Sequence, residues 1–532
     1  MAQWSRPPLD REQVLLFPGR LEEAIPSGHH VRLLDGLLRR LDWSSWEAEY
    51  HVTEGQPAIH PRVLASVLLY GLLKRIRSSR ALEEALQIRL DFRWLAEDRR
   101  MDHTTLSEFR RKHPDELKSL FVKVGLLARE MQVLTLQTLA FDGTRLRANN
   151  RRSGTRTPDE LRTLRAELVV KFEKSERAAR TQDQQDEELL GDANAHELPE
   201  SLANDQRRLA EIDRALAELQ RIEDEAAGEP IPKRVPLTDP ESRVTPNKEG
   251  GFGPNFTPLA TVDVDSGLIV ATDVIALMNE EEHLVAAIQA VQQQFGLATP
   301  PSEVLADGLM GTGANLSQLD ALGVTLYSPA ATRDPAKNPA LRTDLTQPVP
   351  ANQWDRLPTK SVTTHAKVKQ TQLTKEAFVY DAEHDCYWCP NGQALSPGRC
   401  TTETRGDTAI ERTRYQAEAT ACADCPLKTR CLQNPTKPRE ISRDQFEPHR
   451  ERLAQRMSSE VSQQKYARRR HSGERPFAVI KHQFGARQFL LRGLKQVRIE
   501  WLWLSLAFNL RVLLSHLTTP VTNTAPCGTG PP

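Results

Sequence analysis

Three acidic residues stand where carboxylates could act on a phosphodiester. Asp142 and Asp307 each end an apolar run and are each followed by glycine. Such runs predict buried strands, so both carboxylates could emerge at the same edge of a sheet. Glu474 is the single acid between Lys465 and Arg498, a segment with ten Lys or Arg and a formal charge of +9. A carboxylate among cations fits a metal-dependent phosphodiester enzyme, because Mg²⁺ prefers oxygen ligands while phosphates attract positive charge. The alternative for Glu474 is a salt bridge on a basic helix.

Cysteines form a second group that could do chemistry. Six of the seven lie between Cys386 and Cys431, and the pairs Cys386-x-x-Cys389 and Cys422-x-x-Cys425 each offer two thiolates from one turn. This spacing predicts a tetrahedral Zn²⁺ site. Cys389, Cys422, Cys425 and Cys431 are one set of ligands, and Cys386 could replace a member. A thioredoxin-like redox pair or an iron–sulfur cluster is less favoured, because no βαβ pattern surrounds the pairs.

Composition limits the surroundings in which these groups act. The chain has 532 residues, enough for several domains, and its 71 Lys plus Arg balance its 71 Asp plus Glu. A nucleic-acid partner must therefore meet a local basic surface. The N-terminus lacks a secretory pattern, so we expect a cytoplasmic protein in a reducing compartment. In such a compartment, seven cysteines of which six are clustered favour metal binding over a disulfide framework. The apolar run 501–517 is short for a membrane span and contains Asn509 and Arg511, which favours a buried helix.

Several predicted elements must position these residues. Helical spacing predicts a helical domain over 30–130, with helix starts at Pro61 and after Asp102. The second start could face a phosphate, so a helix-turn-helix DNA module and a packing or dimerisation domain are both open. The composition of residues 158–228 predicts one or two long polar helices, with an antiparallel pair favoured. A hairpin turning at 265–267 and alternating strands and helices predict an α/β domain.

Beyond the α/β domain the regular patterns change again. Regular periodicity is lost over 333–446, and helical character returns at 449–472 and 501–517. The last fifteen residues have the composition of a disordered tail.

Taken together, these segments resemble a bacterial insertion-sequence transposase of the DDE type. HPRVLASVLLYGLLKRIRSSRALEEAL and MDHTTLSEFRRKH are similar to the InsH-like transposase N-terminal domain, and AFDGTRLRANN matches the first-Asp motif. The branch with a cysteine-bearing, zinc-ribbon-like insertion before the catalytic Glu is the one that the chain resembles. The Tyr-Arg-Glu-Lys signature of the family is matched here by Tyr466, Arg470 (or Arg469 in its place), Glu474 and Lys481.

The resemblance implies a ribonuclease H-like catalytic domain with an all-helical N-terminal domain, a helical insertion and a cysteine-rich insertion. It implies that Asp142, Asp307 and Glu474 bind two catalytic Mg²⁺ ions, and that Tyr466, Arg470 and Lys481 bind DNA. The expected segments are 1–130 (helical DNA-binding and assembly domain), 131–157 (first catalytic strand), 158–235 (helical insertion), 236–332 (central catalytic segment), 333–448 (cysteine-rich insertion), 449–517 (catalytic helices with the Glu) and 518–532 (disordered tail).

The resulting hypothesis is a cytoplasmic, nucleoid-associated transposase that binds the terminal inverted repeats of its element and performs hydrolysis and strand transfer. Its partners would be double-stranded DNA at the element ends and the target, together with further copies of the chain, because cutting two ends in concert suggests a dimer or larger complex. One alternative is a ribonuclease H-like nuclease that performs no strand transfer. Another is a catalytically inactive, zinc-stabilised DNA-binding protein.

Overall fold

A mixed sheet at the centre of the molecule carries both predicted strand-end aspartates. In the computed structural model its strand order is β7-β6-β1-β8-β9, and β2 and β5 also pair with β6. β6 runs antiparallel to β1 and β7, whereas β1, β8 and β9 are parallel. The α/β class predicted from the sequence is confirmed. The strands are β1 (Thr138–Gly143), β2 (Leu146–Arg147), β5 (Arg243–Pro246), β6 (Phe252–Asp263), β7 (Ile269–Ile275), β8 (Glu303–Leu305) and β9 (Thr325–Tyr327).

The structure describes residues 20–50, 58–151, 154–190, 200–225, 234–247, 250–363, 369–405, 408–432, 434 and 436–518. The tail predicted at 518–532 lies outside these residues from position 519 onward.

Alternating side chains divide the parallel strands into two faces. Ala140, Leu305 and Tyr327 form a small cluster on one face, against which Tyr466 of α15 packs. Their neighbours Phe141, Val304 and Leu326 belong to the main core on the other face. That second face is covered by helices that contact β7, namely α10 and α17. The helices around the sheet are α10 (Leu284–Gln294), α11 (Gly313–Ala321), α14 (Glu447–Met457), α15 (Glu460–Ser472), α16 (Arg475–Ala478) and α17 (Leu494–Thr518), with the π-helical turn η5 (Val479–Gln483) before α17.

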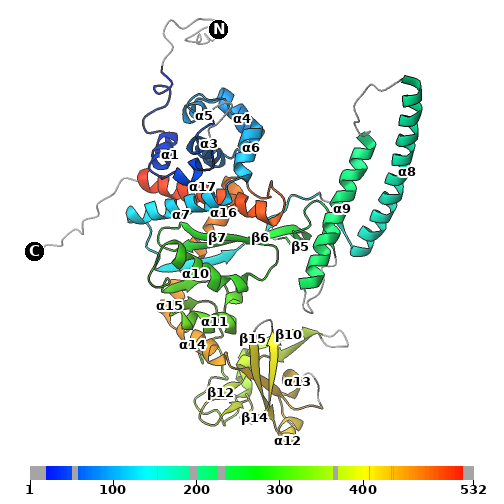
Figure 1. The fold of residues 1–532 in the computed structure, drawn as a ribbon. Coiled ribbons are helices and arrows are strands. Elements are labelled where there is room, and N and C mark those ends of the chain that lie inside the picture. Colours follow the sequence, from blue (N-terminus) through cyan, green and yellow to red (C-terminus); the bar gives the residue numbers. More distant parts are fainter. Residues whose placement is uncertain are drawn as a thin grey trace, which may run out of the picture.

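The N-terminal helices pack around the C-terminal helix α17 (Figure 1). Trp503 of α17 donates to the Arg110 carbonyl, and the buried Asn509 bonds both backbone groups of Ile269 in β7. Helix α17 therefore joins the N-terminal helices to the sheet. These helices are α1 (His30–Arg39), α2 (Ser44–Glu47), α3 (Pro61–Leu73), α4 (Ser79–Ile88), α5 (Leu90–Leu95), α6 (His103–Arg111) and α7 (Pro114–Glu130). Within the described ranges, no helix is long and apolar enough to cross a membrane.

The predicted helix starts are confirmed in this region. α3 begins at Pro61, and Asp102 caps α6 by accepting from the Thr105 amide at 2.6 Å. Packing is one role of the N-terminal helices, because they share a single core with α17. Thr104 and Thr105 are exposed at the start of α6 and could therefore face a phosphate. A helix-turn-helix DNA-binding role for this region stays a prediction.

Two long helices stand apart from the sheet as an antiparallel pair (Figure 1). They are α8 (Pro158–Leu190) and α9 (Glu200–Glu225), and a short ladder of β3 (Thr155–Arg156) with β4 (Val235–Pro236) closes their base. Leu161 and Leu168 of α8 meet Ile212 and Leu219 of α9 in a small core of their own.

The cysteine-bearing segment is more regular than its sequence predicted. The expectation of lost regularity over 333–446 is wrong, because a sheet of order β12-β13-β14-β15-β16 lies there with its own core. The long strands β14 and β15 carry Thr, Glu and Arg on both faces, so the period-two apolar pattern is missing. The elements are β10 (Thr359–Thr363), β11 (Lys369–Leu373), β12 (Val379–Asp381), β13 (Cys386–Trp388), β14 (Ala394–Arg405), β15 (Thr408–Ala417), α12 (Ala419–Ala423), α13 (Lys428–Cys431) and β16 (Glu440–Asp444).

Candidate active site

The register of two parallel strands places Asp142 and Asp307 at one edge of the sheet. Ala140 of β1 pairs with Leu305 of β8, and each aspartate lies two residues beyond its member of that pair. The Asp142 carboxylate accepts from the Gly143 amide at 2.9 Å, and Asp307 caps the short helix η2 (Gly308–Met310) through the Leu309 amide at 2.9 Å. Local backbone bonds therefore hold both carboxylates at the strand ends.

Glu474 reaches the same edge from the junction of α15 and α16. The preceding residue, Gly473, packs directly on β1: a Cβ added there would lie 3.6 Å from the Asp142 Cβ and 3.7 Å from the Ala140 Cβ. These are ordinary van der Waals distances, so the α15–α16 junction packs against the end of β1. The Glu474 side chain is 57% exposed and can reach a partner from solvent.

Arg469 is the cation that joins these carboxylates. Its guanidinium lies 3.0 Å from Asp142 and 4.0 Å from Glu474. Asp142 and Arg469 are almost buried, with side chains 12% and 13% exposed. The Arg469 Nε atom is buried without a hydrogen-bond partner, so the guanidinium is only partly satisfied here. Of the two arginines left open by the sequence, Arg469 faces the carboxylates and Arg470 is exposed.

A fourth carboxylate, which the sequence analysis missed, belongs to the same edge. Glu280 begins the short helix η1 (Glu280–His283) after β7, and its carboxyl group lies against Gly143. We name Asp142, Asp307, Glu474 and Glu280 the carboxylate rim. The signal for Glu280 was the run of three acids after β7, but those acids have the composition of an ordinary helix start.

Burial and mutual repulsion raise the pKa values of two rim carboxylates, Asp142 and Glu280. The pKa of Asp142 is raised by burial, against lowering by Arg469 and the Gly143 amide, and Asp307 and Glu474 raise it further. Burial, followed by the charges of Asp142 and Asp307, raises the pKa of Glu280 to about 7. These groups interact despite sequence separations of 165 residues (142 to 307) and 167 residues (307 to 474).

Tyr466 and Lys481, which the sequence suggested as DNA contacts, make contacts within the protein itself. Tyr466 packs on the cluster of Ala140 and its neighbours. The Lys481 amino group donates to the Thr144 hydroxyl at 2.7 Å and to the Arg145 carbonyl at 2.8 Å. It thereby supports the backbone immediately after Asp142. A DNA-binding role for either residue stays a prediction.

The rim has the donor chemistry of a magnesium site but not its closed arrangement. Nowhere in the described ranges do three or more His, Cys, Asp or Glu side chains stand so that they could hold a metal ion. Carboxylate oxygens are the ligands that Mg²⁺ prefers. The four rim carboxylates share one edge of the sheet, and the Arg469 guanidinium lies beside Asp142 and Glu474. The donor set fits a divalent cation, provided that Arg469 moves from Asp142.

Two protein-family models match parts of the chain. The Transposase DDE domain matches residues 388–514, which include Glu474, and a transposase domain family (DUF772) matches residues 19–112. Both matches support an insertion-sequence DDE transposase. No curated protein matches it. The DDE-domain match contains Glu474 and Arg469 but neither Asp142 nor Asp307, which the fold alone brings to them.

The transposase holds four cysteines near one another in the small cysteine-bearing domain. We name Cys389, Cys422, Cys425 and Cys431 the cysteine cluster. Burial raises the pKa of Cys431 to about 12, and the other three thiols raise it too, although Arg439 lowers it. The pKa of Cys389 is likewise raised by burial, and by Cys425 and Cys422.

The other two cysteines of the described residues lie elsewhere. Cys386 has Asp381 and Asp385 as its charged neighbours, and Cys400 is exposed on β14. The arrangement therefore favours the ligand set that lacks both. None of these groups of thiols is arranged to hold a metal as it stands in the described chain.

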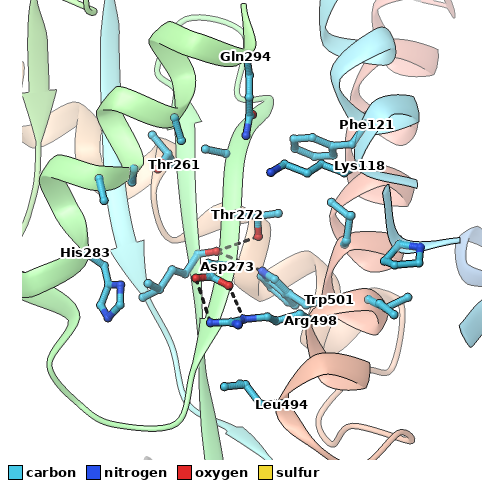
Figure 2. Close-up of a pocket in the computed structure, with 18 of the residues that line it drawn as sticks. Lys118, Phe121, Thr261, Thr272, Asp273, His283, Gln294, Leu494, Arg498 and Trp501 are labelled. Carbon is cyan, nitrogen blue, oxygen red and sulfur yellow. Dashed lines mark hydrogen bonds and ion pairs between the residues drawn. The ribbon is translucent and has the colours of Figure 1, made fainter. Parts of the chain in front are cut away.

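A cleft of about 770 Å³ opens on the sheet face opposite α15 (Figure 2). Helices α7, α10 and α17 border it, and Phe141 and Thr261 contribute to its floor. Arg498 spans it to Asp273, at 2.7 Å. His283 lines the edge of the cleft and belongs to η1, the short helix that carries Glu280. The sheet separates this cleft from Asp142, so we do not assign it to the transposase chemistry.

Proposed function

We propose that this transposase binds the terminal inverted repeats of its element, hydrolyses a phosphodiester at each end and joins the freed 3′-hydroxyl to target DNA. The observation that carries the proposal is the meeting of Asp142, Asp307 and Glu474, from three distant parts of the chain, at one sheet edge. The strand order β7-β6-β1-β8-β9, with antiparallel β7, β6 and β1 followed by parallel β8 and β9, supports a ribonuclease H-like catalytic fold.

Three carboxylates divide the work of this site. Two bound Mg²⁺ ions would supply activation of water or a 3′-hydroxyl and stabilisation of the leaving oxygen. Asp142, held rigidly on β1, would serve both ions, while Asp307 and Glu474 would each complete one. The buried Asp142 excludes water on its side, and the exposed Glu474 faces the side from which DNA would approach.

Exposed cations beside the rim would meet the DNA backbone. Arg470 and Arg475 flank Glu474 and are exposed, and Arg487 is exposed further along the same basic segment. Phosphate contacts of this kind position the DNA and make binding depend on salt. Because two ends are cut in concert, the active complex would contain at least two copies of the chain.

The cysteine cluster would bind one structural Zn²⁺. Four thiols from two short helices and two loops converge, although burial and mutual repulsion oppose the ionised forms of Cys389, Cys425 and Cys431. A zinc ion would remove that cost, because it binds thiolates and stabilises the fold that presents them. Closing the cluster around zinc requires the thiols to move together by small side-chain shifts.

The decisive experiment removes one charge from the rim. Glu474→Gln should lower Mg²⁺-dependent cleavage and strand transfer on element-end DNA by a factor on the order of a hundred or more, while end binding in a gel-shift titration persists. Glu460→Gln, at the exposed start of α15, is the matched control and should cleave like the parent.

Three outcomes separate the rival functions. Cleavage by Glu474→Gln at the parental rate would make the salt bridge with Arg469 its role and remove the third carboxylate from the mechanism. Cleavage without joining by the parent protein would favour the nuclease. DNA binding without any cleavage, unchanged by Asp142→Asn, would favour the inactive DNA-binding protein.

A further inference from the structure

The Glu280 carboxyl group lies where a side chain at position 143 of β1 would stand. A Cβ added to Gly143 would lie 2.6 Å from both the Cδ and an Oε atom of Glu280. Real Cβ atoms do not approach other atoms so closely, so only glycine at position 143 allows the carboxyl group to occupy this place. The contact puts Glu280 next to the residue that follows Asp142.

The turn that carries Glu280 is fixed from both sides. It continues directly into α10, which packs on β7, and it contacts the short helix η2 that Asp307 caps. Asn315 of α11 donates to the Glu281 carbonyl at 2.8 Å and to the Met310 carbonyl at 3.1 Å, so one amide ties η1 to η2. The Glu280 side chain thus starts from an ordered backbone.

Within the residues that the structure describes, the Glu280 charge has no compensating partner at close range. In the described parts of the chain, no hydrogen bond or ion pair joins its carboxylate, although Arg145 is near enough to act through space. The carboxylates of Asp142 and Asp307 face it with the same charge. Burying a carboxylate beside like charges is costly unless a cation compensates it.

We infer that Glu280 is a further ligand of the rim, donating a carboxylate oxygen to a divalent cation that Asp142 and Asp307 also bind. The inference rests on the proposed metal-dependent function and adds a residue to it. β1 presents Asp142 toward the α15 face, whereas Glu280 comes from the α10 face over Gly143. The cation would therefore be held from both faces of the sheet edge.

The test measures cation binding and needs no DNA. Mn²⁺ binding to the full chain, by calorimetry and by the electron paramagnetic resonance of free Mn²⁺, should weaken about tenfold or more in Glu280→Gln, as expected on loss of a charged ligand. Glu280→Asp keeps the charge but shortens the reach, so it should weaken binding nearly as much. Glu282→Gln, an exposed acid of the same turn, should bind within about twofold of the parent.

Gly143→Ala provides an independent test from the other side of the contact. The added methyl would displace the end of the Glu280 side chain, which is flexible, so the protein should fold and yet bind Mn²⁺ as weakly as Glu280→Gln. Thermal unfolding without metal checks that each variant is folded.

The results distinguish this inference from the function on which it rests. If the parent binds Mn²⁺, Asp142→Asn abolishes binding and both Glu280 variants bind like the parent, Glu280 is not a ligand and the proposed function stands. If Glu280→Asp restores parental affinity while Glu280→Gln does not, the residue acts only through its charge and the inference is overturned. A parent that binds no divalent cation overturns both.

Discussion

The carboxylate rim and the cysteine cluster are both groups of metal-binding side chains, but the chain builds them differently. The rim takes one residue each from β1, η1, the end of β8 and the α15–α16 junction, so it exists only when the whole sheet has formed. The cluster takes three of its four thiols from residues 422–431 and the fourth from the turn after β13. Its core is separate from that of the sheet.

Exposure and charge separate the two groups further. Glu474 is largely exposed and a guanidinium already lies among the carboxylates, whereas Cys431 is 9% exposed within a small apolar core. A site that exchanges cations and receives substrate needs an open, charged side, and a site that stabilises a fold does not. We therefore propose that the rim serves chemistry and the cluster serves structure.

Removing a cluster thiol should have the largest effect. Cys425→Ser should reduce zinc from about one per chain to near zero in metal analysis and unfold the cysteine-bearing domain, because structural zinc supplies folding energy. Hydrogen exchange over 369–446 measures the unfolding. Cys400→Ser should keep both zinc and protection, and so should Asp142→Asn in the rim. Zinc lost from Cys400→Ser but not from Cys425→Ser would mean that the ligand set is wrong.

Removing the Arg469 guanidinium should strengthen cation binding at the rim, whereas removing a carboxylate should weaken it. Arg469 competes with any cation for Asp142 at 3.0 Å, so Arg469→Ala should tighten Mn²⁺ binding by about three- to tenfold. Arg468→Ala is the control, because the neighbouring Arg468 pairs with Asp265 instead. Weaker Mn²⁺ binding by Arg469→Ala would show that this arginine organises the rim rather than blocking it.

The sequence predicted the parts of the rim that depend on local pattern. Asp142 and Asp307 follow apolar runs that became β1 and β8, and Glu474 was conspicuous as one acid among cations. Glu280 could not be chosen from three consecutive acids, because the turn of η1 decides which one faces Gly143. Arg469 and Arg470 are adjacent, so the rotation of α15 on the sheet decides between them. Lys465, one turn before Arg469, bonds Glu303 of β8 and fixes that rotation.

Parts of the fold that depend on long-range packing were not predictable in the same way. The apolar run 501–517 predicted a buried helix, but not that α1, α3, α6 and α7 would surround it. The strands of the cysteine-bearing domain escaped notice because their polar residues face both sides. Hydrophobic periodicity indicates which face of a helix or strand is apolar. It gives no such indication where no face is apolar or where all faces are apolar.

Lys481 and Arg470 should separate support of the rim from contact with DNA. Lys481→Ala removes two partly buried hydrogen bonds beside Asp142, so it should lower the free energy of unfolding by about 1–2 kcal/mol. Arg470→Ala should change stability by less than about 0.5 kcal/mol but reduce the salt dependence of end binding by about one phosphate contact. Chemical denaturation and gel shifts at several salt concentrations measure both. A reduced salt dependence in Lys481→Ala would establish that residue as a phosphate contact.

Replacing Asp239 should have the smallest effect on stability and the most specific one, because Asp239 is a buried carboxylate outside both groups. It is 1% exposed, its Oδ1 accepts from the Gly493 amide at 3.1 Å, and its Oδ2 has no hydrogen-bond partner. Burial raises its pKa from 3.8 to about 6, and Glu241 raises it as well, although the Gly493 amide lowers it. Between these values the folded state keeps a proton that the unfolded state has released, so the free energy of unfolding falls as pH rises from about 4 to about 6.

Asp239→Asn should remove that part of the pH dependence. The amide oxygen can still accept from Gly493, so stability at pH 7 should stay within about 1 kcal/mol of the parent or rise slightly. Urea unfolding at a series of pH values measures the change, and cleavage should remain at the parental level. Loss of cleavage on Asp239→Asn would mean that burial of a carboxylate, rather than its convergence with others at the sheet edge, marks the catalytic machinery.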